Sequence, residues 1–217
     1  MLDLDLSGLF DHRDERSVAP TIQILTVCTG NVCRSPLAEQ LLRTRLRPLD
    51  VAVSSAGTRA LIDKPMEPDA AHLAAQLGVA TDDSAAHRAR WLNESHLRTP
   101  DLVLAMSREH RRDIVEVSPA AIRSVFTARE FERLARDVPE AEIRTTAEAA
   151  GTNPHARVRA VLDLLASRRG QLEVPADPFD DDVIDPYRRS WETYQLSAAQ
   201  LLPAIGEIVR VLRATFA

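Results

Sequence analysis

The sequence predicts an α/β protein in which a parallel sheet is covered by helices on both faces. Short apolar and β-branched segments such as 21–27 recur along the chain, and apolar residues at helical spacing occupy the stretches between them. Strands that alternate with helices pair in parallel through right-handed crossovers, which bury both faces of the sheet. The length of 217 residues suits one such domain with insertions.

Four strands and several helices are expected in alternation. The strands are predicted over 21–27, 51–58, 101–106 and 122–127, where apolar and β-branched residues are concentrated. Helices are predicted from Ser35 and around 67–78, 107–117 and 128–137. A final helix is predicted from Arg188 because apolar residues from Trp191 to Leu212 follow a helical period, with Pro203 as a candidate kink.

The remaining segments are interpreted as additions to a single domain over 20–217. Residues 1–19 carry charges without a sustained period, which indicates an N-terminal extension. Residues 137–176 predict a helical insertion of one or two helices, expected to pack on the edge of the domain. An acidic loop broken by prolines, 173–187, leads into the final helix.

Composition excludes several classes of function. The net charge of −5 is spread over well-mixed acidic and basic residues, which argues against nucleic acid or an anionic membrane as a partner. The chain has no run of about 18 apolar residues, and its first residues are acidic where a signal peptide is basic. We therefore expect a cytoplasmic protein. The oligomeric state is left open.

Cysteine usage points to chemistry and not to cross-linking. The only two cysteines, Cys28 and Cys33, lie too close in the sequence to staple a secreted fold, and two cysteines make a poor zinc site. A reducing compartment suits a catalytic thiol. We expect no metal and no cofactor.

A tight loop between the first strand and the first helix carries the clearest functional signal. The segment reads Cys-Thr-Gly-Asn-Val-Cys-Arg-Ser, with Cys28 and Arg34 at the two ends of the loop. At a helix N-terminus, unpaired N–H groups and the macrodipole attract an oxyanion, and left-handed angles at Gly30 and Asn31 would let the N–H groups converge. Arg34 supplies a planar fork that matches two phosphoryl oxygens. The predicted phosphate-binding residues are Thr29, Gly30, Asn31, Val32, Cys33 and Ser35.

Cys28 is the candidate nucleophile of this loop. The helix N-terminus and Arg34 both favour its thiolate form, and Ser35 is in position to hydrogen-bond the sulfur. The alternative is a pair of core cysteines beside an incidental arginine. A nucleotide-binding loop of the Walker type is excluded because its glycine and lysine pattern is missing here.

The loop resembles that of the low-molecular-weight protein tyrosine phosphatases. The shared features are the Cys-x5-Arg-Ser spacing, Gly and Asn inside the loop, and Pro-x-Ala-Glu after it, while 55–58 resembles the Ser-Ala-Gly-Thr segment of the same family. The resemblance covers about 25–215 and is weakest in the middle. It implies a flavodoxin-like, doubly wound fold with a four-stranded parallel sheet, and a phosphomonoester hydrolase that forms a cysteinyl-phosphate intermediate.

The acidic loop supplies a candidate general acid for the leaving oxygen. Asp185, in Asp185-Pro186-Tyr187 just before the final helix, resembles the element that carries the acid in this family, and Tyr187 is expected to line the cleft. A plain turn in a solvated loop is the alternative reading. Asp177, in a similar Asp-Pro-Phe segment eight residues earlier, is a rival that we rank second because it lies farther from the helix.

Two positions match the family by resemblance alone. His87, with Arg90 nearby, matches a histidine that supports the loop asparagine, here Asn31; a surface histidine is the alternative. The family often has an aromatic residue near the position of Leu61 and Ile62, so the preference for phosphotyrosine over other aryl phosphates is left open.

The arginines of 107–117, together with His110, are interpreted as a solvated helix face.

The expected partner is a phosphotyrosine protein or an aryl phosphate. An arsenate reductase that uses a low-molecular-weight thiol is an alternative, since such enzymes share this fold and loop, but the chain lacks further cysteines for an internal relay. A non-catalytic phosphotyrosine-binding module is the second alternative, although all three catalytic candidates are present.

Overall fold

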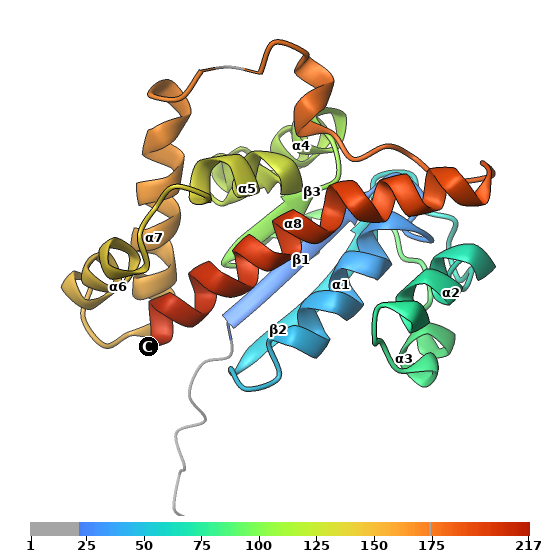
Figure 1. The fold of residues 1–217 in the computed structure, drawn as a ribbon, viewed down its shortest axis with the longest axis horizontal. Helices are drawn as coiled ribbons and strands as arrows, with labels where there is room; N and C mark the ends of the chain where they lie inside the picture. The colour runs from blue at the N-terminus through green and yellow to red at the C-terminus, as the bar shows by residue number, and fades with distance from the viewer. Residues whose placement is uncertain (1–21, 174) are drawn as a thin grey trace, which may run out of the picture.

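The fold is built on a four-stranded parallel sheet, seen in the computed structural model of residues 22–173 and 175–217 (Figure 1). The strands are β1 (Ile22–Cys28), β2 (Val51–Gly57), β3 (Leu102–Ala105) and β4 (Val125–Thr127), in the order β2-β1-β3-β4. Every adjacent pair is parallel. The predicted α/β architecture is confirmed. The proposed extension over 1–19 lies outside the described residues.

Helices connect and follow the strands. The α-helices are α1 (Arg34–Arg45), α2 (Pro68–Gln76), α3 (Thr81–Ala86), α4 (Arg108–Val117), α5 (Ala128–Ala135), α6 (Glu140–Ala149), α7 (Pro154–Ser167) and α8 (Trp191–Phe216). The 3-10 helices are η1 (Glu94–Leu97), η2 (Pro119–Arg123), η3 (Arg168–Gly170) and η4 (Pro178–Asp181). None of the helices in the described part of the chain combines the length and apolar character that a membrane span requires.

Two details of the sequence prediction are corrected. The strand expected over 122–127 is shorter, because a proline at position 119 starts η2 and only Val125–Thr127 joins the sheet. Helices α3 and η1 were not expected, since their short polar sequences carry no apolar period.

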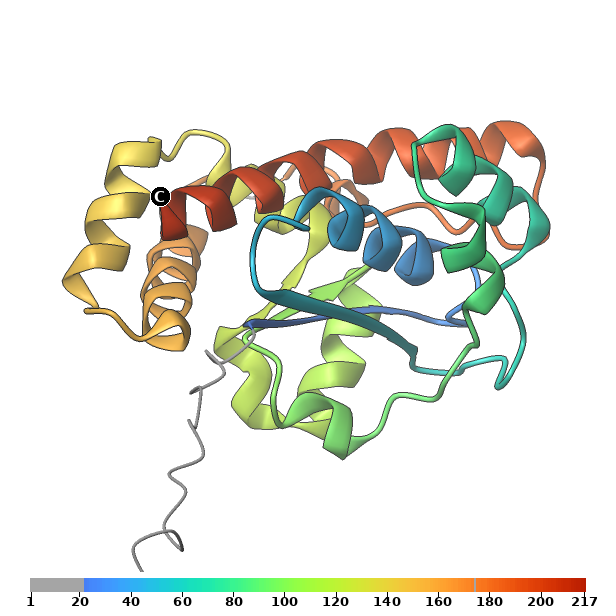
Figure 2. The same cartoon turned by 90° about the horizontal axis from the view of Figure 1, so that it is seen from below.

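The side chains of β1 alternate between two cores. Ile22 and Ile24 face the layer formed by α1, α5 and α8, while Leu25 and Val27 face α4 with η1 and η2. Figure 2 shows α1 and α8 on one side of the sheet and α4 on the other. This arrangement leaves the carboxyl ends of the strands free to form a site, at the point between β1 and β3 where the chain changes direction along the sheet.

Within residues 137–173 the chain forms α6 and α7, which pack against α8 and α5 through buried residues such as Ile143 and Leu162. They lie beside the C-terminal end of α8, away from the carboxyl ends of the strands (Figure 1). Because α6 and α7 pack on these helices, the helical segment extends the core.

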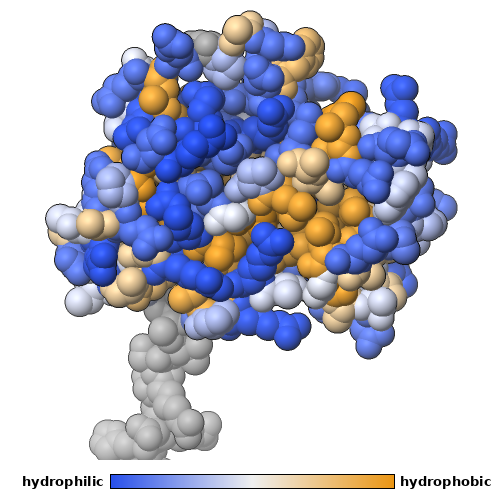
Figure 3. Space-filling model, viewed as in Figure 1, coloured by the Kyte–Doolittle hydropathy of each residue, from blue (hydrophilic) through white to orange (hydrophobic). Residues whose placement is uncertain are grey.

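On the face of the molecule shown in Figure 3 the surface is mostly hydrophilic, with apolar residues gathered near its middle, where α8 runs beside α1.

The core between α5 and the sheet predicts a large effect of one truncation. Phe131 is fully buried and meets Phe126 edge to face, with ring centroids 5.5 Å apart. Phe131→Ala should lower the free energy of unfolding by about 3–5 kcal/mol, because it removes buried apolar contacts and leaves a cavity. Urea denaturation followed by circular dichroism measures this change. Ile122→Ala, at a side chain that is 50% exposed, is the control and should change it by less than about 0.5 kcal/mol; similar losses in both variants would contradict the core assignment.

Candidate active site

The loop between β1 and α1 turns its carbonyl groups outward. Cys28 is the last residue of the strand and Arg34 the first of the helix. The five carbonyl oxygens from Cys28 to Val32 accept hydrogen bonds from Thr58 N, Arg59 N, Leu61 N, His87 Nε2 and Glu67 N. Because the carbonyls are satisfied outside the loop, the N–H groups are left for another partner.

The loop N–H groups form an anion site. In the described part of the chain, the N–H groups of Gly30, Val32 and Cys33 have no protein partner, while Asn31 N donates to Cys28 Sγ at 3.3 Å. Asn31 has a φ of 55°, in the left-handed region, whereas Gly30 has no positive φ, which corrects half of the prediction. One left-handed residue is sufficient to turn this loop, and successive N–H groups of this kind bind anions.

A chain of polar side chains reaches the sulfur of Cys28. Ser55 Oγ donates to Glu39 Oε2 at 2.5 Å, and Asn31 Nδ2 donates to Ser55 Oγ at 2.8 Å and to Ser35 Oγ at 3.0 Å. Ser35 Oγ lies 3.0 Å from Cys28 Sγ. Ser35 Oγ accepts from Asn31, and its own proton has two acceptors within reach, Ala56 O at 3.4 Å and the sulfur of Cys28. This arrangement places a hydroxyl group directly beside the Cys28 sulfur.

Cys33 has a different environment. It lies in the core side of the loop, with its Sγ 3.9 Å from Tyr194 Oη. Burial raises the pKa of the Cys33 thiol to about 12. The raised pKa keeps the Cys33 thiol protonated at neutral pH, which makes it a poor nucleophile.

Arg34 lies almost fully buried at the edge of the loop. Its Nη1 donates to Val183 O at 3.0 Å and its Nη2 pairs with Asp185 Oδ2 at 2.8 Å. Its Nε is buried without a hydrogen-bond partner among the described residues. A buried donor of this kind is costly to leave unpaired, so its position favours a ligand oxygen.

The cleft above the loop brings most of the expected site residues together. Its volume is about 120 Å³, and it is lined by Cys28, Thr29, Gly30, Val32, Cys33, Arg34, Arg59, Leu61, Asp185 and Tyr187. Asn31 and Ser35 are buried behind the loop. Asp177 does not line the cleft; its carboxylate accepts a hydrogen bond from Phe179 N at the start of η4. Of the two Asp-Pro segments, only the one with Asp185 faces Cys28.

His87 and Arg90 hold Asn31 from behind. His87 Nε2 lies 2.8 Å from Asn31 O, and Arg90 N donates to Asn31 Oδ1 at 2.9 Å. Burial lowers the pKa of His87, so a neutral imidazole with a proton on Nε2 suits the carbonyl acceptor. The contact predicted by resemblance is present, made to the backbone of Asn31, and its effect on activity stays a prediction.

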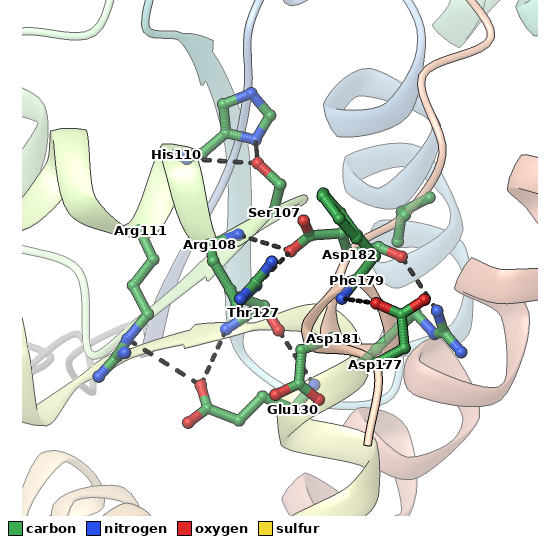
Figure 4. A network of polar contacts seen from close by, with 12 residues as sticks. Ser107, Arg108, His110, Arg111, Thr127, Glu130, Asp177, Phe179, Asp181 and Asp182 are labelled. Carbon is green, nitrogen blue, oxygen red and sulfur yellow. Dashed lines mark hydrogen bonds and ion pairs between the residues drawn. The ribbon is translucent and has the colours of Figure 1, made fainter. Parts of the chain in front are cut away.

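His110 was missed in the sequence. The ring is buried, with Nε2 2.8 Å from Thr29 Oγ1 in the loop and Nδ1 2.9 Å from Ser107 Oγ, the N-cap of α4 (Figure 4). The interpretation of this helix as a solvated face is therefore wrong for His110. A signal was available: His110 is one turn before Ile114, which is also buried, so the two share a face.

Gly57 fixes the distance between β2 and the loop. It pairs with Cys28 in the sheet register, and a Cβ at this position would lie 2.4 Å from Thr29 O. Only glycine permits the loop backbone to approach β2 so closely. Within the described residues, no group of three or more His, Cys, Asp or Glu side chains is placed to hold a metal ion.

These features define an α/β protein in which the loop between a strand and a helix presents free N–H groups beside a thiol and a buried arginine. A family model described as low molecular weight phosphotyrosine protein phosphatase matches residues 23–172. The chain belongs to this family and is a phosphoric monoester hydrolase of the protein tyrosine phosphatase class. The match ends before Asp185, so the choice of acid depends on geometry.

Individual proteins with similar sequences carry names of the same family. The probable low molecular weight protein-tyrosine-phosphatase EpsP of Ralstonia solanacearum is 41% identical over 116 residues, 54% of this chain and 77% of that protein. The phosphatase Etp of Escherichia coli is 44% identical over 96 residues, 44% of this chain and 62% of Etp.

Two solved structures are similar. The low molecular weight protein tyrosine phosphatase from T. tengcongensis has a TM-score of 0.59 at 28% identity, covering 87% of this chain and 98% of that one. The YwlE arginine phosphatase from Geobacillus stearothermophilus has a TM-score of 0.61 at 26% identity, covering 88% and 93%.

The burial of His110 predicts a pH dependence of stability. Burial, followed by the charges of Arg34 and Arg59, lowers the pKa of His110 to about 3. Below about pH 6.5 the imidazole of His110 is protonated in the unfolded chain but stays neutral in the folded protein. The free energy of unfolding therefore falls as pH falls, by up to about 1.4 kcal/mol per pH unit from this residue. Chemical denaturation between pH 7 and 4.5 measures the slope.

His110→Gln should make that slope shallower, since it removes the group that titrates only on unfolding. His72→Gln, at an exposed position, controls for the loss of a histidine and should keep the slope of the unmodified protein. If the free energy of unfolding changed with pH equally in the unmodified protein and in His110→Gln, His110 would take up its proton as readily in the folded protein as in the unfolded chain, which would contradict the prediction.

Proposed function

We propose that this chain hydrolyses phosphotyrosine in proteins, and small aryl phosphates, through a cysteinyl-phosphate intermediate. The observation that carries the proposal is the convergence of Cys28, Arg34 and Asp185 on one cleft, with Arg34 Nη2 2.8 Å from Asp185 Oδ2. This set also argues against a module that only binds phosphotyrosine, which would have no use for a nucleophile and an acid.

The first half of the reaction transfers the phosphoryl group to sulfur. The free loop N–H groups and Arg34 bind the phosphoryl oxygens, and Arg34 exchanges Asp185 for the substrate. The Cys28 thiolate then attacks phosphorus, so that an S–P bond forms while the bond from phosphorus to the aryl oxygen breaks. Asp185, which takes up a proton from solvent once it is released from Arg34, donates that proton to the aryl oxygen.

The second half restores the enzyme. Asp185, now a carboxylate, accepts a proton from water, whose oxygen attacks phosphorus and displaces the sulfur. Inorganic phosphate and the Cys28 thiolate result. Ser35 Oγ, 3.0 Å from the sulfur, stabilises the thiolate both as nucleophile and as leaving group.

The walls of the cleft favour an aryl phosphate. Leu61, Val32 and Tyr187 provide apolar surface for an aromatic ring, while the charge of Arg59 is paired with Glu109. YwlE is named an arginine phosphatase, but a polar guanidinium group would gain less than a phenyl ring from these apolar walls. Phosphoarginine and arsenate are therefore comparison substrates, and faster turnover of either than of phosphotyrosine would overturn this assignment.

Substitution of the two cysteines tests the nucleophile. Cys28→Ser should abolish turnover of p-nitrophenyl phosphate while retaining binding of vanadate, because the loop N–H groups and Arg34 remain. Cys33→Ser is the matched control and should keep activity, since Cys33 is a buried, protonated thiol. Steady-state kinetics and vanadate titration measure both. Appreciable hydrolysis by Cys28→Ser would refute the mechanism.

Substitution of the two aspartates tests the acid. Asp185→Asn should slow hydrolysis of phosphotyrosine by on the order of 10²–10⁴-fold, because its phenolate leaves poorly without a proton. The activated p-nitrophenyl phosphate should be affected less in the phosphorylation step, which a pre-steady-state burst of nitrophenol reports. Asp177→Asn should leave both substrates within a few-fold of the unmodified enzyme. The reverse pattern would move the acid to Asp177.

A further inference from the structure

A second cleft adjoins the cleft above the loop. It has a volume of about 410 Å³ and lies between the first turns of α4 and the segment 179–185. Thr29, Arg34 and Asp185 line both clefts. Ligand sites commonly measure about 300–1,000 Å³, so a substrate held at Cys28 has room to continue past Asp185 into this second space.

The wall formed by residues 177–183, named the acidic strap here, is held in place by arginines from α4 and α5. Figure 4 shows the contact between Arg108 and Asp182. Arg133 forms a two-pronged pair with Asp181 at 2.8 and 3.2 Å, and Arg129 donates to Asp182 O at 3.1 Å. Asp182 Oδ1 accepts from Arg108 N, at the start of α4, at 2.8 Å. Because these contacts fix the backbone of the acidic strap, its other side chains keep a fixed arrangement. Less conformational entropy of the strap would then be lost when a ligand binds beside it.

The strap and the residues after it present apolar side chains to the second cleft. Phe179 is 70% exposed, with the Arg108 guanidinium 5.3 Å from its ring centre, and Ile184 is 40% exposed. Large apolar side chains grouped beside a cleft indicate a contact surface, because covering them removes apolar area from water.

One positive charge in this cleft is unpaired. Among the other charged side chains that line it, Arg34 pairs with Asp185, Arg108 with Asp182, and Glu109 with Arg59. Arg112 is exposed and has no partner in the described residues. The charge that the cleft can still accept is therefore negative.

We propose that the second cleft binds the polypeptide next to the phosphorylated residue of a protein substrate, with an apolar side chain on Phe179 and Ile184 and an acidic side chain at Arg112. The proposal rests on the proposed function, since it assigns the part of the substrate beyond the phosphoryl group. The continuity of the two clefts at Asp185 and the unpaired charge of Arg112 select an extended acidic peptide as the occupant.

The test compares peptides with a small substrate. One phosphotyrosine peptide carries Leu and Glu beside the phosphotyrosine, a second carries Leu and Lys, and p-nitrophenyl phosphate has no flanking residues. The unmodified enzyme should prefer the acidic peptide.

The Arg112→Glu variant should have a kcat/KM for the acidic peptide that is lower by about 5-fold, mainly through KM, and it should prefer the lysine peptide instead. Phe179→Ala should lower kcat/KM for both peptides by about 5–10-fold. Turnover of p-nitrophenyl phosphate should stay within about twofold in both variants, since Phe179 and Arg112 line only the second cleft.

Matched controls lie on η2, before β4 and so at the opposite end of that strand from the site. Arg123→Glu makes the same change of charge as Arg112→Glu, and Ile122→Ala truncates a side chain that is 50% exposed. Neither should alter the preference between peptides. Equal effects of Arg112→Glu and Arg123→Glu would reduce the result to overall charge and overturn the proposal, as would equal losses on peptides and p-nitrophenyl phosphate.

Failure of the proposed function gives a different result. An enzyme that turns over none of the three substrates would contradict the phosphatase assignment. The second cleft would then be tested by binding of the same two peptides, with a non-hydrolysable phosphonate in place of phosphate, measured by fluorescence anisotropy. Loss of the acidic preference in Arg112→Glu would still support the peptide site, and its retention would overturn it.

Discussion

The outward direction of the loop carbonyls is the constraint on which the site depends. A backbone that satisfies its carbonyl groups on one side can offer its N–H groups on the other, and five hydrogen bonds from 58–67 and His87 hold the loop in this state. Asn31 adds the single left-handed residue that closes the turn. The strand before it and the helix after it then fix Cys28 and Arg34 at the two ends.

Most of the polar contacts behind the loop serve to keep this backbone in one conformation. Asn31 uses its side chain on Ser35, Ser55 and Arg90 N, and its carbonyl on His87. A buried network in which each donor has an acceptor is rigid, whereas a partly satisfied one is costly. The loop therefore has N–H groups without partners on the side of the cleft and hydrogen-bonded polar groups on the opposite side. An ordinary turn does not show this difference between its two sides.

Features formed by consecutive residues could be predicted from the sequence better than features that the fold assembles from distant segments. Cys28 to Ser35 could be interpreted without a fold, because strand, loop and helix follow one another and their chemistry is local. Asp185 and Asp177 could not be separated by physics alone, since the path of an irregular acidic loop depends on its tertiary ion pairs. His110 was hidden for a related reason: the arginines that surround it in the sequence suggested a solvated helix, although its spacing from Ile114 indicated a buried face. The shorter fourth strand reflects a local 3-10 turn, which apolar content does not reveal.

The ion pair between Arg34 and Asp185 has a consequence for how the site chooses among anions. The carboxylate, held at 2.8 Å, is a resident competitor that any incoming ion must replace. Chloride offers one charge and no matching geometry, whereas a phosphoryl dianion offers two oxygens in the plane of the guanidinium fork and further oxygens to the loop. An anion that cannot replace this carboxylate is therefore kept away from the guanidinium by a side chain of the protein itself.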